Sequence, residues 1–473
     1  MKRLVVVGGG ISGTAAAFAA RKSAEALRRP LEVRLLERER EIGGKARSHR
    51  ESAWLFETGP IGYLTTEPIV DELVRDVGLE QKLLVASDAH KHRFVYSRGR
   101  VREVEAHPIG FATSGLLSLK GLLRAAGEPF IPAKADDSDE SVWHFAARRL
   151  GPEFADRLIH PMVLGIFAGD AKRLSLEAAF PLMASLERDH GSLVRAQIAR
   201  ARLRRKGQLP PRRSSLCSFE EGIQSLPLAL AFSPGISVST GVRVDALARL
   251  PGGRYRLAIR QMEDPIEADA VILACEGFRN AQILSQLEPG IARQLELIAY
   301  PPVAVVALGY GSEARRVIPR GFGVLLPRGA GYRALGATWD GYLFDKRNAE
   351  EHLLIRVLFG GSFDPEIASR GPDELMETAK REMAVLLGLD AEPFFSRAKL
   401  WERAIPQYEL GHLESIRRIE EALSGLPGLY LAGNALYGTA FGKAAATGVR
   451  CGRAAVEWLF DTKHGERRTD GAN

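Results

Sequence analysis

The chain has 473 residues, of which 45% are hydrophobic and 26% are charged, a composition typical of a folded protein with two to four domains and more than one core. This composition excludes a disordered, collagen-like or coiled-coil protein, and no stretch is apolar over the ~20 residues that a membrane-spanning helix needs. The net charge of +7 permits an acidic partner, an anionic membrane surface or a polyanionic substrate. Three scattered cysteines, Cys217, Cys275 and Cys451, provide neither a disulfide framework nor a metal site, and predict a reducing, cytoplasmic compartment.

The amino-terminal segment predicts a strand, a glycine turn, a helix and a second strand. Residues 4–7 are apolar and are followed by Gly8, Gly9, Gly10, Ile11, Ser12 and Gly13. Residues 14–29 are apolar at helical spacing, and the second strand ends in Glu37. In this motif the glycines permit a tight turn, close approach of a pyrophosphate and close packing of helix on strand. The helix N-terminus attracts phosphate, and Glu37 can accept hydrogen bonds from a ribose diol, so the segment predicts a dinucleotide site.

The residues after Glu37 distinguish a flavin from a nicotinamide. A second glycine pair, Gly43-Gly44, is followed by the basic residues Lys45 and Arg47, and then by residues 56–60, Phe-Glu-Thr-Gly-Pro. This pattern resembles the extended signature of FAD-dependent amine oxidases and their relatives. In those enzymes the glycines and bases hold the diphosphate from its other side, and the second segment passes the isoalloxazine ring. A solvated basic loop is the alternative for Lys45 and Arg47.

The carboxyl-terminal segment predicts a further part of the same domain. Residues 426–434 indicate a turn, a buried strand and the pair Gly433-Asn434; small residues follow at 438–448, and 450–460 are apolar at helical spacing. A strand that leads into a glycine-rich helix N-terminus is again a place for a cofactor phosphate or a flavin oxygen. Residues 271–274 predict another strand of that sheet. We therefore expect a cofactor domain assembled from distant segments.

The middle of the chain carries the more selective motifs. Residues 91–214 are interpreted as mostly helical and are unusually basic. Residues 159–170 and 174–181, with blocks at 91–100, 321–327, 359–361 and 401–413, resemble the oxygen-dependent protoporphyrinogen oxidase family. The matches extend from residue 4 to about residue 450, and the blocks 165–170 and 405–413 are the most selective.

The resemblance implies an α/β plus α+β architecture in three parts. These are a Rossmann-like FAD-binding domain built from discontinuous segments (1–90, 215–290 and 411–473), an antiparallel-sheet substrate domain (291–410) and a helical insert (91–214) that dips into one membrane leaflet. The implied reaction oxidises protoporphyrinogen IX to protoporphyrin IX through FAD, with O2 as the terminal acceptor and H2O2 as its product, in haem biosynthesis.

The resemblance also implies site residues. It assigns FAD to residues 8–13, Glu37, Gly44, Lys45, Thr58, Gly59, Pro60, Ile61, Val244, Trp401, Thr439, Ala440 and Phe441. It assigns the substrate to Arg93, which would pair with a porphyrin propionate, and to Gly169, Leu325, Thr338 and Leu358 around the macrocycle. A broad apolar ring with carboxylates on one edge needs aliphatic walls and a fixed cation, for which an arginine fork is well suited. No catalytic acid–base pair and no metal site is identified, and His160 and His412 are interpreted as structural.

Three positions depart from the family pattern. Phe441 is bulky where small residues meet the flavin, Glu276 stands where proline is usual, and the segment 219–222 has one glycine fewer than expected. These departures weaken the substrate assignment more than the fold. A coproporphyrinogen III oxidase, an amine oxidase and a carotenoid desaturase therefore stay open as alternatives. Coproporphyrinogen carries four carboxylates and calls for more than one cation, and Arg98 and Arg100 lie near Arg93.

The expected partners are the porphyrinogen, O2 and a membrane. The basic run 195–213 raises nucleic-acid binding as a separate class, but it lacks interleaved aromatic residues and a recognition fold. A solvated or lipid-facing segment explains the run better. With apolar stretches such as 109–123, it predicts peripheral attachment to the inner face of the cytoplasmic membrane, and a homodimer is left open.

Overall fold

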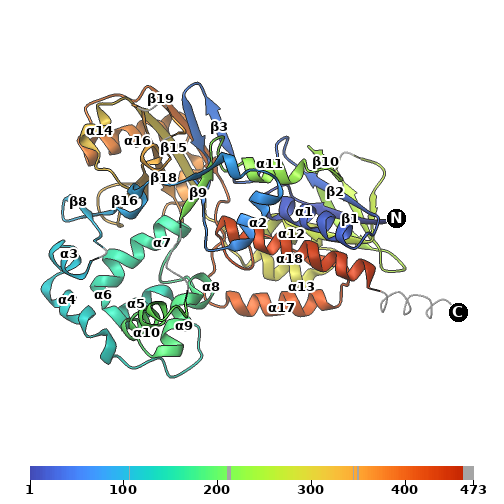
Figure 1. Ribbon diagram of the computed structural model, residues 1–473, viewed down its shortest axis with the longest axis horizontal. Helices are drawn as coiled ribbons and strands as arrows, with labels where there is room; N and C mark the ends of the chain where they lie inside the picture. The colour runs from blue at the N-terminus through green and yellow to red at the C-terminus, as the bar shows by residue number, and fades with distance from the viewer. Residues whose placement is uncertain (106, 210–214, 261, 345, 349–350, 462–473) are drawn as a thin grey trace.

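The computed structural model describes residues 1–461 except 106, 210–214, 261, 345 and 349–350 (Figure 1). Within these residues a parallel sheet with its helices, a larger sheet and a group of helices form three neighbouring regions, and the chain passes between them several times. This arrangement confirms the predicted fold class, including the assembly of one domain from distant segments.

The parallel sheet is built from five strands of the predicted cofactor domain. Its order is β10-β2-β1-β14-β20, and all neighbours run parallel. The strands are β1 (Lys2–Val7), β2 (Leu31–Glu37), β10 (Ile236–Thr240), β14 (Ala270–Leu273) and β20 (Leu429–Leu431). Because β1 is buried on both faces, Val5 and Val7 enter one core cluster while Leu4 and Val6 enter another.

Helices α1 (Ile11–Ala26) and α18 (Phe441–Phe460) cover one face of this sheet and lie side by side (Figure 1). A Cβ on Gly448 would lie 2.0 Å from the Ser12 carbonyl oxygen, and one on Gly452 would lie 2.3 Å from that of Ala16. The glycines therefore allow the two backbones to touch. Since residue numbers increase together along the contact, the helices are parallel and their N-termini lie at the same end.

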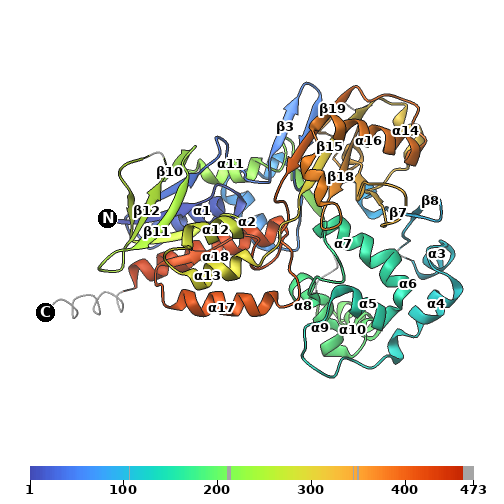
Figure 2. The same ribbon diagram turned by 180° about the vertical axis from the view of Figure 1, so that it is seen from behind.

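The other face of the sheet is covered by further segments (Figure 2). They are α12 (Gly277–Leu284), α13 (Pro289–Glu296), α17 (His412–Ser424), β11 (Val244–Arg249), β12 (Tyr255–Ile259) and β13 (Ile266–Ala268). Ile291 and Leu295 of α13 belong to the same core cluster as Val271 of β14. The expected boundary at residue 290 therefore falls too early, because α13 packs with the cofactor domain.

The larger sheet has seven strands in the order β19-β15-β18-β17-β16-β7-β8. They are β7 (Arg93–Ser97), β8 (Arg100–Glu103), β15 (Val303–Tyr310), β16 (Gly323–Leu325), β17 (Gly336–Thr338), β18 (Leu353–Gly360) and β19 (Phe395–Trp401). Neighbouring strands are antiparallel except β16 and β7. Helix α16 (Pro372–Leu387) packs on one face, with α14 (Ala314–Val317) and α15 (Asp340–Leu343) at its margin.

The helical insert was expected to begin at residue 91, but the structure places 93–103 in this sheet. The physical reason is a two-residue hairpin turn. Arg98 and Gly99 have φ of 53° and 77° and lie between Ser97 and Arg100, which pair with each other. The first helix of the helical region, α3 (Pro108–Thr113), follows only after β8.

The helical region continues as α4 (Leu119–Ala126), α5 (Val142–Leu150), α6 (Pro152–Phe154), a π-helical turn η4 (Ala155–Ile159), α7 (His160–Phe167), α8 (Leu176–Ala179), α9 (Pro181–His190) and α10 (Leu193–Arg205). Its interior contains Arg149, which donates through Nε to Glu128 at 2.9 Å and through Nη1 to Glu187 at 3.1 Å. Among the described residues, no helix combines the length and apolarity needed to cross a membrane.

Short elements connect the three regions. They are β3 (Ser48–Glu51), β4 (Trp54–Glu57), β5 (Tyr63–Leu64), α2 (Pro68–Asp76), β6 (Leu83–Val85), β9 (Leu216–Phe219) and α11 (Ser225–Ala231). Strand β9 pairs with β5 and β6, and so returns the chain from the helical region to the amino-terminal segment.

Candidate functional site

The glycine turn after β1 combines two structural glycines with one that the chain itself does not require. A Cβ on Gly8, whose φ is +110°, would lie 2.8 Å from the Ala274 oxygen, and one on Gly13 would lie 1.8 Å from the Gly8 oxygen. A Cβ on Gly10, in contrast, would meet no atom closer than Gly44 Cα at 3.9 Å. No side chain caps the first turn of α1 either. The open space over these amides suits a phosphate.

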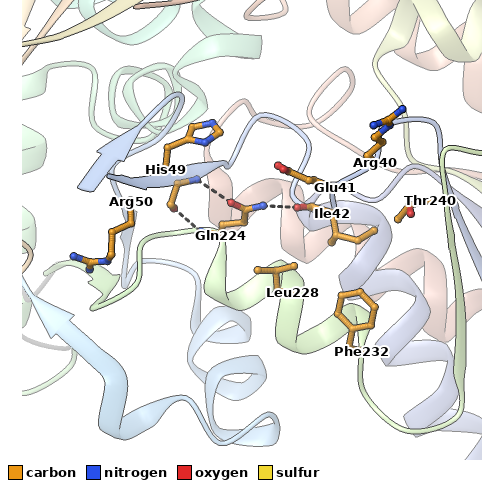
Figure 3. Close-up of a pocket in the computed structure, with 10 residues that line it drawn as sticks. Arg40, Glu41, Ile42, His49, Arg50, Gln224, Leu228, Phe232 and Thr240 are labelled. Atoms are coloured by element: carbon orange, nitrogen blue, oxygen red, sulfur yellow. Dashed lines mark hydrogen bonds between the residues drawn. The ribbon is translucent and has the colours of Figure 1, made fainter. Parts of the chain in front are cut away.

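The second glycine motif closes over the first. The Gly43 amide donates to the Gly9 oxygen at 2.9 Å, and a Cβ on Gly44 would lie 3.1 Å from Gly10 Cα. Gln224 holds this loop from outside, donating through Nε2 to the Ile42 oxygen at 2.7 Å and accepting from the Ser48 amide at 3.0 Å (Figure 3). The hollow drawn in Figure 3 is lined by other residues than those predicted for the cofactor or substrate.

The charged groups of the predicted FAD site are buried. Glu37 Oε2 accepts from the Gly9 amide at 2.5 Å and Oε1 from the Glu39 amide at 2.8 Å, while burial raises the pKa of this carboxyl. Lys45 Nζ lies 3.4 Å from Glu276 Oε1 and has no hydrogen-bond partner among the described residues. Burial lowers the pKa of Lys45, and its ammonium lies 5.4 Å from the centroid of the Tyr300 ring. The solvated-loop alternative is therefore wrong for Lys45, and Glu276 is its counter-ion.

The segment expected beside the flavin ring is held by three side chains from the larger sheet and its connections. Trp401 Nε1 donates to the Thr58 oxygen at 2.7 Å, which brings together two predicted residues 343 positions apart. Arg356 donates to the Glu57 oxygen at 3.0 Å and the Gly59 oxygen at 2.7 Å. Arg347 lies 3.0 Å from the Glu57 carboxylate and donates to the Ile61 oxygen at 3.4 Å. Pro60 lies between these anchored residues.

These two arginines, Arg347 and Arg356, contact the predicted FAD segment and were not predicted from the sequence. Arg356 is 4% exposed and pairs with Asp340 at 2.7 Å. A charged residue inside the apolar run 353–359 was the available signal, because such a residue is rarely buried without a partner.

The carboxyl-terminal segment brings a second helix N-terminus to the site. Ala440 precedes α18, whose first turn has no side-chain cap, and Thr439 precedes Ala440. The Phe441 ring is turned into the core, 6.1 Å from the Tyr63 ring centroid, so the bulk of this side chain is accommodated there. Val244 begins β11, and the nearby Val242 amide donates to the Glu37 oxygen at 2.8 Å.

Four of the five predicted substrate residues lie on one face of the larger sheet. Gly323 of β16 lies opposite Arg93 of β7 on one side and opposite Thr338 of β17 on the other. Two residues along β16, Leu325 lies opposite Gly336 of β17, and Gly336 in turn lies opposite Leu358 of β18. Side chains two residues apart share a face, so Arg93, Leu325, Thr338 and Leu358 share this one. Helix α7 crosses the same face, since a Cβ on Gly165 would lie 2.5 Å from Leu325 Cδ2. The Thr338 hydroxyl is already engaged, donating to Asp340 at 2.7 Å.

The fifth residue, Gly169, leads to the selective block at 405–413. A Cβ on Gly169 would lie 2.1 Å from Gln407 Oε1, and Gln407 Nε2 donates to the Phe167 oxygen at 2.8 Å. The neighbouring Tyr408 hydroxyl accepts from the Gly438 amide at 2.8 Å and donates to the Asn434 oxygen. The block therefore joins the end of α7 to the turn before α18.

Among the described residues no group of three or more His, Cys, Asp or Glu side chains is placed to hold a metal ion. His412 stacks on Tyr408 at 4.1 Å between ring centroids, and burial lowers its pKa. The arrangement suits cofactor chemistry in which the protein binds and orients. The contacts of individual residues with FAD and substrate stay predictions.

Comparison with known proteins places this geometry among flavoproteins. The family described as flavin containing amine oxidoreductase matches residues 14–456. The chloroplastic protoporphyrinogen oxidase of Oryza sativa subsp. japonica is 32% identical over 464 residues, covering 93% of this chain and 85% of that protein. The coproporphyrinogen III oxidase of Bacillus subtilis (strain 168) is 28% identical over 469 residues, covering 97% and 99%. The crystal structure of a proposed protoporphyrinogen oxidase from Exiguobacterium sp. 255-15 superposes with a TM-score of 0.81 at 25% identity, covering 97% of this chain and 98% of that one.

Proposed function

Because the chain belongs to the flavin containing amine oxidoreductase family and is an FAD-dependent oxidoreductase, we propose that it oxidises a porphyrinogen to the corresponding porphyrin. O2 is the terminal acceptor, and one porphyrinogen with three O2 gives one porphyrin and three H2O2, which balances the six electrons and six protons removed. The observation that carries the proposal is the shared sheet face of Arg93, Leu325 and Leu358, beside the segment held by Trp401 and Arg356.

The residues at the glycine turns fit FAD. The space over Gly10 and the uncapped first turns of the parallel helices α1 and α18 would accommodate the diphosphate and a flavin oxygen. Lys45, whose ammonium lacks a hydrogen-bond partner among the described residues, would donate to the same region, and Glu37 would bind the ribose. When bound, FAD supplies the two-electron acceptor for each oxidation.

The sheet face supports a substrate site for a tetrapyrrole. Leu325 and Leu358 would pack on the apolar ring and exclude water, and Arg93, which is exposed, would pair with a propionate. The expected substrate is protoporphyrinogen IX. Coproporphyrinogen III is the second candidate, because the Bacillus subtilis relative, which matches over nearly its whole length, is named coproporphyrinogen III oxidase.

The experiment that tests the proposal measures flavin, porphyrin and peroxide together. Purified protein should show flavin absorption bands, and either porphyrinogen should give fluorescent porphyrin with three H2O2 for each porphyrin. Removal of O2 should stop turnover after the bound flavin is reduced. Protein denatured by heat corrects for spontaneous oxidation. Protein that stays colourless with added FAD, or flavoprotein that oxidises neither porphyrinogen above this background, would refute the proposal.

We further propose peripheral attachment to the inner face of the cytoplasmic membrane. Part of the expected apolar stretch is core, since Leu116 and Leu117 are buried. Leu119 and Leu123, in contrast, are 74% and 68% exposed, and the nearby Phe130 is 85% exposed. Figures 1 and 2 place α3 and α4 at the end of the helical region farthest from the parallel sheet. Such side chains can enter the headgroup boundary while basic residues attract anionic lipid.

Helix α10 supplies basic residues for this attachment. Arg195, Arg202 and Arg205 are exposed on it beside the exposed Val194 and Ile198. Arg212 and Arg213 of the same basic run lie outside the described residues. Vesicles with anionic lipid should sediment the wild type at low salt and release it as salt rises. A variant with Leu119→Ser and Phe130→Ser should sediment less and keep its FAD. Wild-type protein that never sediments would contradict this attachment.

A further inference from the structure

We propose that Arg328 is a second carboxylate-binding residue of the substrate site, at the opposite end of β16 from Arg93. The pair would then recognise a porphyrinogen that carries carboxylates on two opposite edges. This inference rests on the proposed function, and it concerns which porphyrinogens the site distinguishes.

The two arginines bracket the apolar centre of the predicted substrate face. Arg93 lies opposite Gly323, the first residue of β16, and Arg328 follows two residues after Leu326. The chain stays extended to Leu326, whose amide donates to the Leu335 oxygen at 3.0 Å. At ~3.3 Å per residue, the distance from Gly323 to Arg328 reaches ~16 Å, enough to place one cation on either side of a tetrapyrrole ring packed on Leu325.

Arg328 also lies on the correct side of the sheet. Its guanidinium lies 3.8 Å from the centroid of the Phe363 ring. Phe363 packs against the core cluster that contains Leu164 and Ala168, beside Leu358, so it belongs to the face that α7 crosses. His160 of α7 contacts the same ring at 5.4 Å between centroids. Arg328 is therefore positioned at the margin between α7 and the face that carries Leu325 and Leu358.

The charge of Arg328 is available to a ligand. Arg328 and Arg93 are both exposed, and neither forms an ion pair with another described residue. Other arginines of the same region are neutralised: Arg333 pairs with Asp364, Arg347 with Glu57 and Arg356 with Asp340. The Arg328 guanidinium lies over the Phe363 ring, which restricts the planar group and leaves its N–H groups for a carboxylate.

The chemistry of the two candidate substrates separates the roles of the arginines. Protoporphyrinogen IX has carboxylates on one edge and vinyl groups on the other, whereas coproporphyrinogen III has carboxylates on both. A cation at each end of β16 matches the second pattern. Arg93 would serve both molecules, and Arg328 would serve only the molecule with four carboxylates.

The test measures the binding of the two fluorescent porphyrins, coproporphyrin III and protoporphyrin IX, and kcat/KM for both porphyrinogens. Arg328→Ala should weaken the binding of coproporphyrin III by ~10- to 100-fold, the range of a hydrogen bond to a charged group, and should leave protoporphyrin IX within about twofold of wild type. Arg93→Ala should weaken both. The matched control is Arg381→Ala, an exposed arginine on α16, which covers the opposite face, and it should change neither.

The outcomes separate this inference from the proposed function. An active wild type whose Arg328→Ala variant loses both substrates equally, or neither, would overturn the role of Arg328 and leave the proposed function standing. A wild type that oxidises neither porphyrinogen would overturn both. Arg328→Lys should recover only part of the selectivity, because an ammonium does not reproduce the bidentate fork.

Discussion

Replacing Gly10 by alanine should separate cofactor binding from folding. Gly10 has φ −73° and ψ 177°, which alanine adopts without strain, and the nearest atom to the new Cβ is 3.9 Å away. We therefore expect the free energy of unfolding of the FAD-free protein to stay within ~1 kcal/mol of wild type. The methyl group would instead occupy the space assigned to the diphosphate.

The expected loss of FAD affinity follows from the contacts that the methyl group would displace. Loss of two hydrogen bonds from the first turn of α1 to a charged phosphate, at ~1.5–3 kcal/mol each, amounts to ~3–6 kcal/mol or a ~10²- to 10⁴-fold higher Kd. FAD affinity is measured by titrating protein stripped of flavin, and stability by urea unfolding of the same preparation.

Gly452→Ala provides the matched control. Its Cβ would lie 2.3 Å from the Ala16 oxygen, in the contact between α1 and α18 and away from the glycine turns. It should therefore lower the free energy of unfolding by ~1–3 kcal/mol, while folded protein still binds FAD. A Gly10→Ala protein with wild-type FAD affinity would refute the placement of the diphosphate over this residue.

Three further variants test the contacts around the site. Tyr408→Phe leaves the Gly438 amide and the Asn434 carbonyl without their partner, at a cost of ~1–3 kcal/mol each. FAD affinity should therefore fall and the flavin absorption maxima should shift. An unchanged spectrum and an unchanged Kd would contradict a link between Tyr408 and the FAD site through the turn before α18. Arg347→Met strands the buried Glu57 carboxylate and should lower stability to urea by ~3–5 kcal/mol, with partial recovery in the double variant with Glu57→Gln. Burial lowers the pKa of His412, so below the pKa of about 6.5 that it has in the unfolded chain, the unfolded chain binds a proton that the folded protein does not. The free energy of unfolding therefore falls as the pH drops below about 6.5, by at most ~1.4 kcal/mol per pH unit. Between pH 7 and 5, the stability of His412→Gln measured by thermal unfolding should fall less than that of the wild type. An equal fall in both proteins would show that His412 does not cause the loss of stability.

Four of the five strands of the parallel sheet were predictable, because β1, β2, β14 and β20 are short apolar runs. The fifth strand, β10, contains Ser237, Ser239 and Thr240 and was not predicted. Strand β1, strand β2 and helix α1 therefore lie where periodicity and the glycine spacing indicate, within a few residues. The hairpin at 93–103 was interpreted as helical because its basic residues obscure the alternation of the buried Phe94 with its neighbours. Its turn at Arg98-Gly99 was the informative signal.

The contacts that assemble the site were not predictable from local pattern. Arg356 and Gly59 are 297 positions apart, and Trp401 and Thr58 are 343 apart, so nothing in either neighbourhood specifies the pairing. The orientation of Phe441 depends likewise on Tyr63, a distant residue. Sequence reasoning identified the residue types at the site, but their pairing is a property of tertiary packing.

The parallel packing of α18 on α1 has a consequence for synthesis of the protein. Helix α1 ends at Ala26 and its partner α18 ends at Phe460, so the side of α1 that packs on α18 stays uncovered until residue 460 has left the ribosome. At ~5–20 residues per second, this interval lasts from about twenty seconds to about a minute and a half. During that time the nascent chain exposes the alanine-rich surface of α1 and lacks the second helix N-terminus of the FAD site. Flavin capture is therefore expected to follow the synthesis of α18, and chaperones that shield α1 should raise the yield of holoprotein.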